Sequence, residues 1–86
     1  MKKILSDQEL QEFHHKGTGF IYNDYGTDNK HDPYNVLHDC SCVHVRRMDT
    51  KTAKYHFDSI EGSKAWLESN RGAEGEKWRR CKFCLK

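Results

Sequence analysis

Residues 81–84 carry the pattern best suited to chemistry in this sequence, Cys81-x-x-Cys84. Two residues between cysteines allow the backbone to turn so that both sulfur atoms reach one tetrahedral ion. Such a pair supplies two of the four ligands of a typical zinc site. The spacing therefore predicts half of a metal centre at these residues.

The other half has to come from the segment 38–44, which contains two histidines and two cysteines. His38 and Cys42 have three residues between them, which lies within the usual spacing of zinc ligands. Cys40 and Cys42 have only one, which strains a common tetrahedron. We therefore predict that the metal ligands are His38, Cys42, Cys81 and Cys84, with Cys40 as the alternative ligand.

The ligand types favour Zn²⁺ as the cofactor. Two separated pairs that include a histidine suit the tetrahedral nitrogen and sulfur sites of zinc, whereas iron–sulfur sequences carry more cysteines at close spacing. Four protein ligands leave no coordination position for water, which is the arrangement of a structural site. The sequence thus favours a non-catalytic zinc-binding module over a zinc enzyme.

The composition explains why a metal would be needed. The chain has 86 residues, of which 35% are hydrophobic and 33% are charged. A core of that size stabilises a small domain only weakly, so a metal or disulfides must contribute. The segment 1–6 has no apolar run of the kind found in signal peptides, so we expect a cytoplasmic location, where thiols stay reduced. No segment approaches the roughly 20 apolar residues of a membrane span.

Local signals predict the elements that position the ligands. Ser6 and Glu9 form a capping-box pattern, and Gly17 supplies a helix stop, so a short helix is expected over residues 7–15. Asp58 and Glu61 repeat the capping box before a second helix that ends near Asn70. Three strands are expected, over residues 19–22, 34–38 and 54–57, followed by a C-terminal knuckle that contains the second cysteine pair.

Together these elements predict an α+β fold, a small zinc-stapled domain built on a three-stranded antiparallel meander. The whole chain, residues 1–86, is expected to form one domain. Its N-terminal helix lies within residues 1–17, and the zinc-stapled core occupies residues 18–86.

Several of these motifs occur together in a known family. His38-Asp-Cys-Ser-Cys42, Tyr55-His-Phe57, a capped helix that contains Ala65, and Arg80-Cys81-Lys-Phe-Cys84 together resemble the zinc-binding domain of Ada-type DNA-repair proteins. The resemblance covers residues 34–86. The chain also resembles small bacterial domains in which L-H-x-x-x-C precedes C-x-x-C.

In Ada-type proteins a C-x-x-x-C pair and a C-x-x-C pair close one zinc site, and the first cysteine accepts a methyl group from a DNA phosphotriester. His38 stands at that first position in this sequence. An imidazole cannot replace the zinc-activated thiolate. The resemblance therefore implies a shared scaffold and metal, without the transfer reaction.

An enzyme is the competing interpretation, and it would be nuclease-like or alkyl-transferring. Its centre would be Cys40, or the 23–33 loop with His31 and Asp32. The loop lacks a second acidic cluster, and a Cys40 thiol that binds no metal lacks the ion that would lower its pKa. A Cys40→Ser variant separates the two interpretations, because a module would keep both metal and binding while a thiol enzyme would lose its activity.

Charge is distributed unevenly along the chain. Residues 1–42 contain four Lys/Arg against seven Asp/Glu, and residues 43–86 contain eleven against six. A basic face could hold the phosphates of DNA or RNA while aromatic side chains stack on bases. A solvated surface, or one that contacts another protein, would account for the same charges. We expect a monomer without membrane association. The candidate nucleic-acid contacts are Arg46, Arg47, Lys54, Arg79, Arg80 and Lys82.

Overall fold

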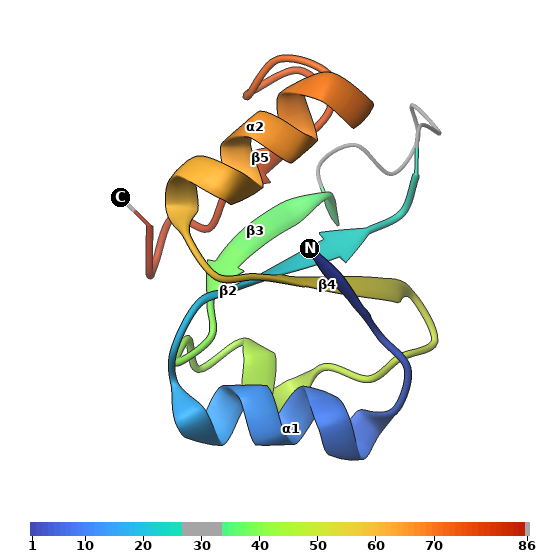
Figure 1. Cartoon of the computed structure of the whole chain (residues 1–86), viewed down its shortest axis with the longest axis vertical. Helices are drawn as coiled ribbons and strands as arrows, with labels where there is room; N and C mark the ends of the chain where they lie inside the picture. The colour runs from blue at the N-terminus through green and yellow to red at the C-terminus, as the bar shows by residue number, and fades with distance from the viewer. Residues whose placement is uncertain (27–33, 86) are drawn as a thin grey trace.

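A five-stranded sheet lies between two helices in the computed structural model, which describes residues 1–26 and 34–85. Figure 1 shows α1 on one face of the sheet and α2 on the other. The helices are α1 (Asp7–Lys16), α2 (Ile60–Asn70) and a short 3₁₀ helix, η2 (Val45–Arg47). The strands are β1 (Lys2–Ile4), β2 (Phe20–Asp24), β3 (Val36–Asp39), β4 (Ala53–Phe57) and β5 (Arg79–Arg80).

The strand order, β1-β4-β2-β3-β5, differs from the predicted meander. The β2–β3 hairpin forms as predicted, with Ile21 opposite His38. However, β4 pairs with the other side of β2 instead of following β3, and β1 adds to β4. The free side of β3 is taken by β5, which pairs in parallel with it. The α+β class is confirmed, whereas the three-stranded meander is not matched, because β4 pairs with β2 instead of β3 and two short strands extend the sheet.

Both α-helices begin at serine caps. Ser6 accepts a hydrogen bond from the Glu9 N–H at 3.1 Å, and the Glu9 carboxylate accepts from the Leu5 N–H at 3.0 Å. Ser59 caps α2 by accepting from the Gly62 N–H at 2.9 Å, so the cap is one residue later than the predicted Asp58. These contacts satisfy amides that a helix leaves without partners in its first turn.

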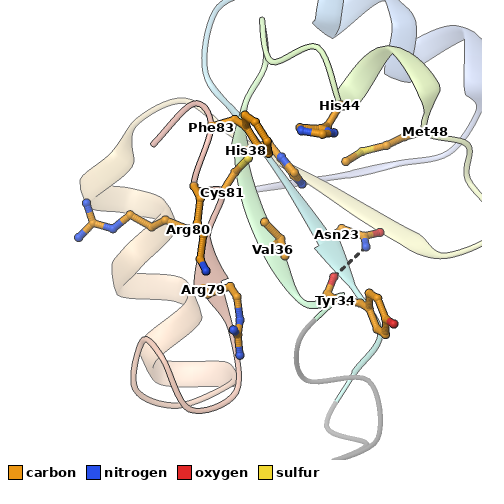
Figure 2. A pocket seen from close by; sticks show the side chains of 11 residues that line it. Asn23, Tyr34, Val36, His38, His44, Met48, Arg79, Arg80, Cys81 and Phe83 are labelled. Carbon is orange, nitrogen blue, oxygen red and sulfur yellow. Dashed lines mark hydrogen bonds between the residues drawn. The ribbon is translucent and has the colours of Figure 1, made fainter. Parts of the chain in front are cut away.

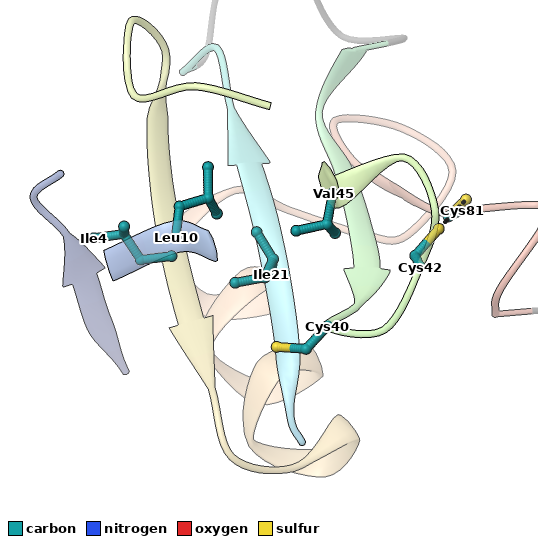
Figure 3. Packing of buried hydrophobic residues seen from close by; sticks show 7 residues of the cluster. All are labelled: Ile4, Leu10, Ile21, Cys40, Cys42, Val45 and Cys81. Carbon is teal, nitrogen blue, oxygen red and sulfur yellow. Dashed lines mark hydrogen bonds between the residues drawn. The ribbon is translucent and has the colours of Figure 1, made fainter. Parts of the chain in front are cut away.

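Two apolar clusters fill the space on the two faces of the sheet. The cluster under α1 is drawn in Figure 3 and contains Ile4, Leu10, Ile21, Val45, Cys40, Cys42 and Cys81. The cluster under α2 contains Tyr22, Leu37, Phe57, Leu67 and Trp78. Neighbouring strand residues such as Ile21 and Tyr22 enter different clusters because side chains alternate between the faces of a strand.

Asn35 holds the C-terminal segment against the sheet. Its buried side-chain amide donates to the Lys77 carbonyl at 3.1 Å and to the Gly26 carbonyl at 2.9 Å. The backbone carbonyl of Asn35 accepts from the Arg79 N–H at 2.9 Å, and the Cys81 N–H donates to the Leu37 carbonyl at 2.8 Å. This short parallel ladder places Cys81 beside the end of β3.

Candidate metal centre

Four side chains that are distant in sequence meet at the end of β3. His38 lies in β3, Cys42 follows it in a turn, Cys81 comes directly after β5, and Cys84 lies one turn later. One ligand atom from each lies within 4.8 Å of the others. The Cys42 and Cys81 Sγ atoms are 4.0 Å apart. Sulfur ligands about 2.3 Å from a tetrahedral zinc ion would lie roughly 3.8 Å apart, so the arrangement is close to that of a loaded site.

A compact turn after β3 brings Cys42 back toward His38. The Asp39 carboxylate accepts from the Ser41 N–H at 2.8 Å and from the Ser41 hydroxyl at 2.6 Å. The Asp39 carbonyl accepts from the Cys42 N–H at 3.0 Å, and the Cys42 carbonyl accepts from the Val45 N–H at 3.0 Å. Aspartate side chains favour such turns, which explains why three residues suffice between the two candidate ligands.

Backbone amides point at the sulfur atoms of the second pair. The Leu85 N–H donates to the Cys81 carbonyl at 2.9 Å, which closes the turn between the two cysteines. The Asp39 N–H donates to Cys84 Sγ at 3.3 Å. Amides that donate to ligand atoms orient those atoms and stabilise their negative charge. The turn is thus organised to present thiolates to a cation.

His38 is held in its neutral, ligating form. Burial lowers its pKa to about 4, and the positive charges of His44 and Lys54 act in the same direction. Its Nδ1 atom is buried and has no hydrogen-bond partner among the described residues. A buried polar atom without a partner destabilises a fold unless something binds it. A metal at this centre is one way to satisfy the imidazole, and the donor set fits one.

The thiols influence each other's protonation. Burial raises the pKa of Cys84, and the adjacent Cys42 thiol adds to that effect. Burial pushes the pKa of Cys81 upward, but hydrogen bonds from the Cys84 and Phe83 backbone and from the Cys84 and Cys42 thiols together outweigh it, so the net pKa of Cys81 is lowered. Negative charges on sulfur atoms this close together repel one another. A divalent cation between the sulfur atoms would offset that repulsion.

Cys40 lies outside this group. Its side chain is 0% exposed and packs in the cluster under α1, where Figure 3 shows its sulfur directed toward Ile21 and away from Cys42 and Cys81. Burial, with a smaller contribution from Asp39, raises the pKa of Cys40 to about 12. At neutral pH this thiol is therefore protonated and a poor nucleophile. The other proposed enzyme centre, His31 and Asp32, lies outside the described residues.

The predicted basic residues have different surroundings. Lys54 is buried and donates to the Thr52 carbonyl at 2.9 Å, so its assignment to a basic surface was wrong. Arg80 forms an ion pair with Glu74 at 2.7 Å. Arg46 and Arg47 are exposed on η2. Arg79 and Lys82 line a groove beside the four-residue cluster, which the sequence patterns did not predict.

Metal affinity at this centre is expected to fall as the pH falls from about 8 to about 6, because protons compete with the metal for the thiolates. The loss should be up to about tenfold per pH unit for each thiol that takes a proton. His38 acts at lower pH. Its folded-state pKa of about 4 is below the ordinary histidine value of 6.5, so its contribution to stability is lost as the pH falls from 6.5 through 4. Competition with a coloured chelator at several pH values would measure the first effect, and an affinity that does not vary with pH would contradict it.

Among residues 1–26 and 34–85, neither α1 nor α2 has the length and apolar composition of a membrane-spanning helix. Comparison of the chain with family models, with curated proteins and with solved structures gave no match.

Proposed function

We propose that this chain is a structural zinc-binding module in which one Zn²⁺ ion joins the end of β3 to the turn after β5. The observation that carries the proposal is the convergence of one imidazole and three thiols within 4.8 Å. These donors come from two segments of the chain, and Cys42 and Cys81 are 39 residues apart in the sequence. The cysteines of the described residues are all free thiols, so no disulfide among these residues joins the two segments.

Zinc is the ion that this donor set favours. Thiolates select soft or borderline metals and disfavour magnesium and calcium, which prefer oxygen ligands. One nitrogen and three sulfur donors in a small tetrahedral cluster are typical of structural zinc sites. The resemblance to Ada-type domains remains a prediction, and the proposal extends it only to the metal and the scaffold.

The proposed role is structural because the four side chains would fill all four positions of a tetrahedral ion. A catalytic zinc ion keeps a position open for water or substrate. Cys40, the remaining thiol, is buried and has a raised pKa, so it supplies no reactive thiolate near the ion. The cluster therefore has neither the open coordination position nor the reactive thiolate that a catalytic role would use.

The ion would also supply stability where the strand pairing is shortest among the described strands. The ladder between β3 and β5 contains two residue pairs, Val36 with Arg79 and Leu37 with Arg80. Structural zinc sites contribute an apparent 10–16 kcal/mol (a rough range) at neutral pH, as much as the whole stability of about 5–15 kcal/mol that a small domain has. Metal binding and docking of the C-terminal segment should therefore be coupled.

Native mass spectrometry with and without a chelator, combined with proton NMR of the same samples, tests this proposal. We expect one zinc ion per chain and a dispersed amide spectrum that collapses when the metal is removed, because metal binding and folding are linked. A reduced, metal-free protein that keeps a dispersed spectrum and a cooperative melting transition would show that the ion is not structural.

A further inference from the structure

A groove of about 540 Å³ lies next to the four-residue cluster, between the β5 segment and the surface formed by β2, β3 and η2. Val36 and Met48 contribute apolar side chains to its lining. Phe83 borders it near the cluster and Tyr34 lies at the other end, as Figure 2 shows. We refer to this feature as the groove.

The charge of the groove is entirely positive. No Asp or Glu side chain lines it among the described residues, whereas Arg79 and Lys82 do. The Nε atom of Arg79 is buried and has no hydrogen-bond partner within the described part of the chain. Arg80 also borders the groove, but Figure 2 shows its side chain extending away from Val36, and Glu74 pairs with it. The groove therefore offers two cations to an anionic ligand.

Aromatic rings with exposed faces accompany these cations. Phe83 is 75% exposed, although it lies between two candidate metal ligands in the tightly turned segment 81–84. Its ring centroid is 4.9 Å from that of His44, at an interplanar angle of 56°, so a tilted contact with His44 supports the ring. Tyr34 is 58% exposed. A supported and exposed aromatic ring is a suitable stacking surface for a planar ligand.

We propose that the groove binds a short single-stranded stretch of nucleic acid, with a base stacked on Phe83 and phosphates at Arg79 and Lys82. Proteins that bind single strands combine these features, a positive groove and aromatic platforms. A duplex keeps its bases stacked on one another and would leave Phe83 unused. Every nucleotide carries a planar base beside its phosphate, whereas an acidic peptide has a ring near its charges only where its sequence places an aromatic residue. This inference rests on the proposed zinc site, because His38 and Cys81 form part of the groove lining.

Fluorescence anisotropy with labelled single-stranded DNA and RNA of about eight nucleotides tests the proposal, since such sites commonly cover 4–16 nucleotides (a rough range). The zinc content of every sample is measured in parallel. Phe83→Ala should weaken binding roughly tenfold, and Phe83→Trp should restore it, because stacking depends on the ring. Leu5→Ala is the matched control, since Leu5 is 78% exposed on the segment after β1, at the opposite edge of the sheet.

The salt dependence tests the phosphate contacts separately. Each phosphate neutralised on a single strand contributes about −0.7 to the slope of the logarithm of affinity against the logarithm of salt concentration. Lys82→Ala should reduce the slope by about that amount, while Lys3→Ala, on β1, should leave it unchanged.

Three results would overturn the proposal: no binding by the zinc-loaded protein, equal losses for Phe83→Ala and Leu5→Ala, or tighter binding to a duplex or to an acidic peptide. None of these affects the zinc site, whose occupancy is measured in the same samples. Absence of zinc from a folded protein would instead contradict the proposed function.

Discussion

Replacement of Cys42 by alanine is expected to abolish stoichiometric zinc binding and the cooperative unfolding transition. Cys42 supplies one of the four ligand atoms, and its sulfur lies 4.0 Å from that of Cys81. With one thiolate removed, the remaining ligands bind zinc too weakly to make up for the small stability that the hydrophobic core supplies. The loss should approach the total stability of a small domain, about 5–15 kcal/mol. Native mass spectrometry and thermal denaturation would measure both effects.

Cys40→Ala is the matched control for this experiment. Cys40 and Cys42 are both buried and only two residues apart, but Cys40 is not part of the four-residue cluster. Removal of its sulfur leaves a small cavity under α1 that costs about 1–2 kcal/mol. The variant should keep one zinc ion per chain. Loss of zinc from Cys40→Ala, or its retention by Cys42→Ala, would show that the ligand assignment is wrong.

Trp78→Ala is expected to lower the free energy of unfolding of the zinc-loaded protein by about 3–5 kcal/mol, the usual cost of removing a buried aromatic side chain. Trp78 is fully buried in the cluster under α2, and its indole N–H donates to the Gly72 carbonyl at 2.8 Å. It also directly precedes β5, so its packing fixes the segment that carries Cys81. Urea denaturation monitored by circular dichroism would measure the change.

Trp78→Phe distinguishes packing from hydrogen bonding at the same position. The phenyl ring keeps most of the buried apolar volume but leaves the Gly72 carbonyl without its donor, which should cost about 1–3 kcal/mol. The alanine variant should therefore be clearly less stable than the phenylalanine variant. Equal stabilities would indicate that the hydrogen bond, rather than the packing of the ring, holds this segment.

The helices were the most predictable part of the fold because their signals are local. Ser6 and Glu9 define the start of α1, and Gly17 ends it with a φ of +68°, close to the predicted range. The cap of α2 was predicted one residue early because Asp58 and Ser59 are both good caps, and only the observed bond from the Gly62 N–H distinguishes them.

The two short strands could not be predicted because their pairing depends on tertiary contacts. β1 contains Lys2 and Lys3, and β5 consists of Arg79 and Arg80, so neither shows the apolar alternation of a half-buried strand. β1 is fixed by its pairing with β4 and β5 by its pairing with β3. The meander differs from the structure for the same reason, because nothing in residues 54–57 shows that this strand pairs with β2 rather than with β3.

The candidate site shows the same division between local and distant information. Spacing alone indicated His38 with Cys42 and Cys81 with Cys84, and the structure brings these four together. The sequence could not indicate that Lys54 would be buried, because a lysine within a strand gives no local sign of burial. The groove was missed because it forms only when β5 and η2 lie on either side of Val36.

The two-residue length of β5 has a consequence for the protein after metal loss. β5 covers part of the side of β3 that does not face β2. If the C-terminal segment detaches, the backbone carbonyls of Asn35 and Leu37, which accept from the Arg79 and Cys81 N–H groups, become free to pair with a strand of another molecule. Such open strands are templates for aggregation. Apo protein should therefore self-associate as it unfolds, and zinc would protect solubility as well as structure.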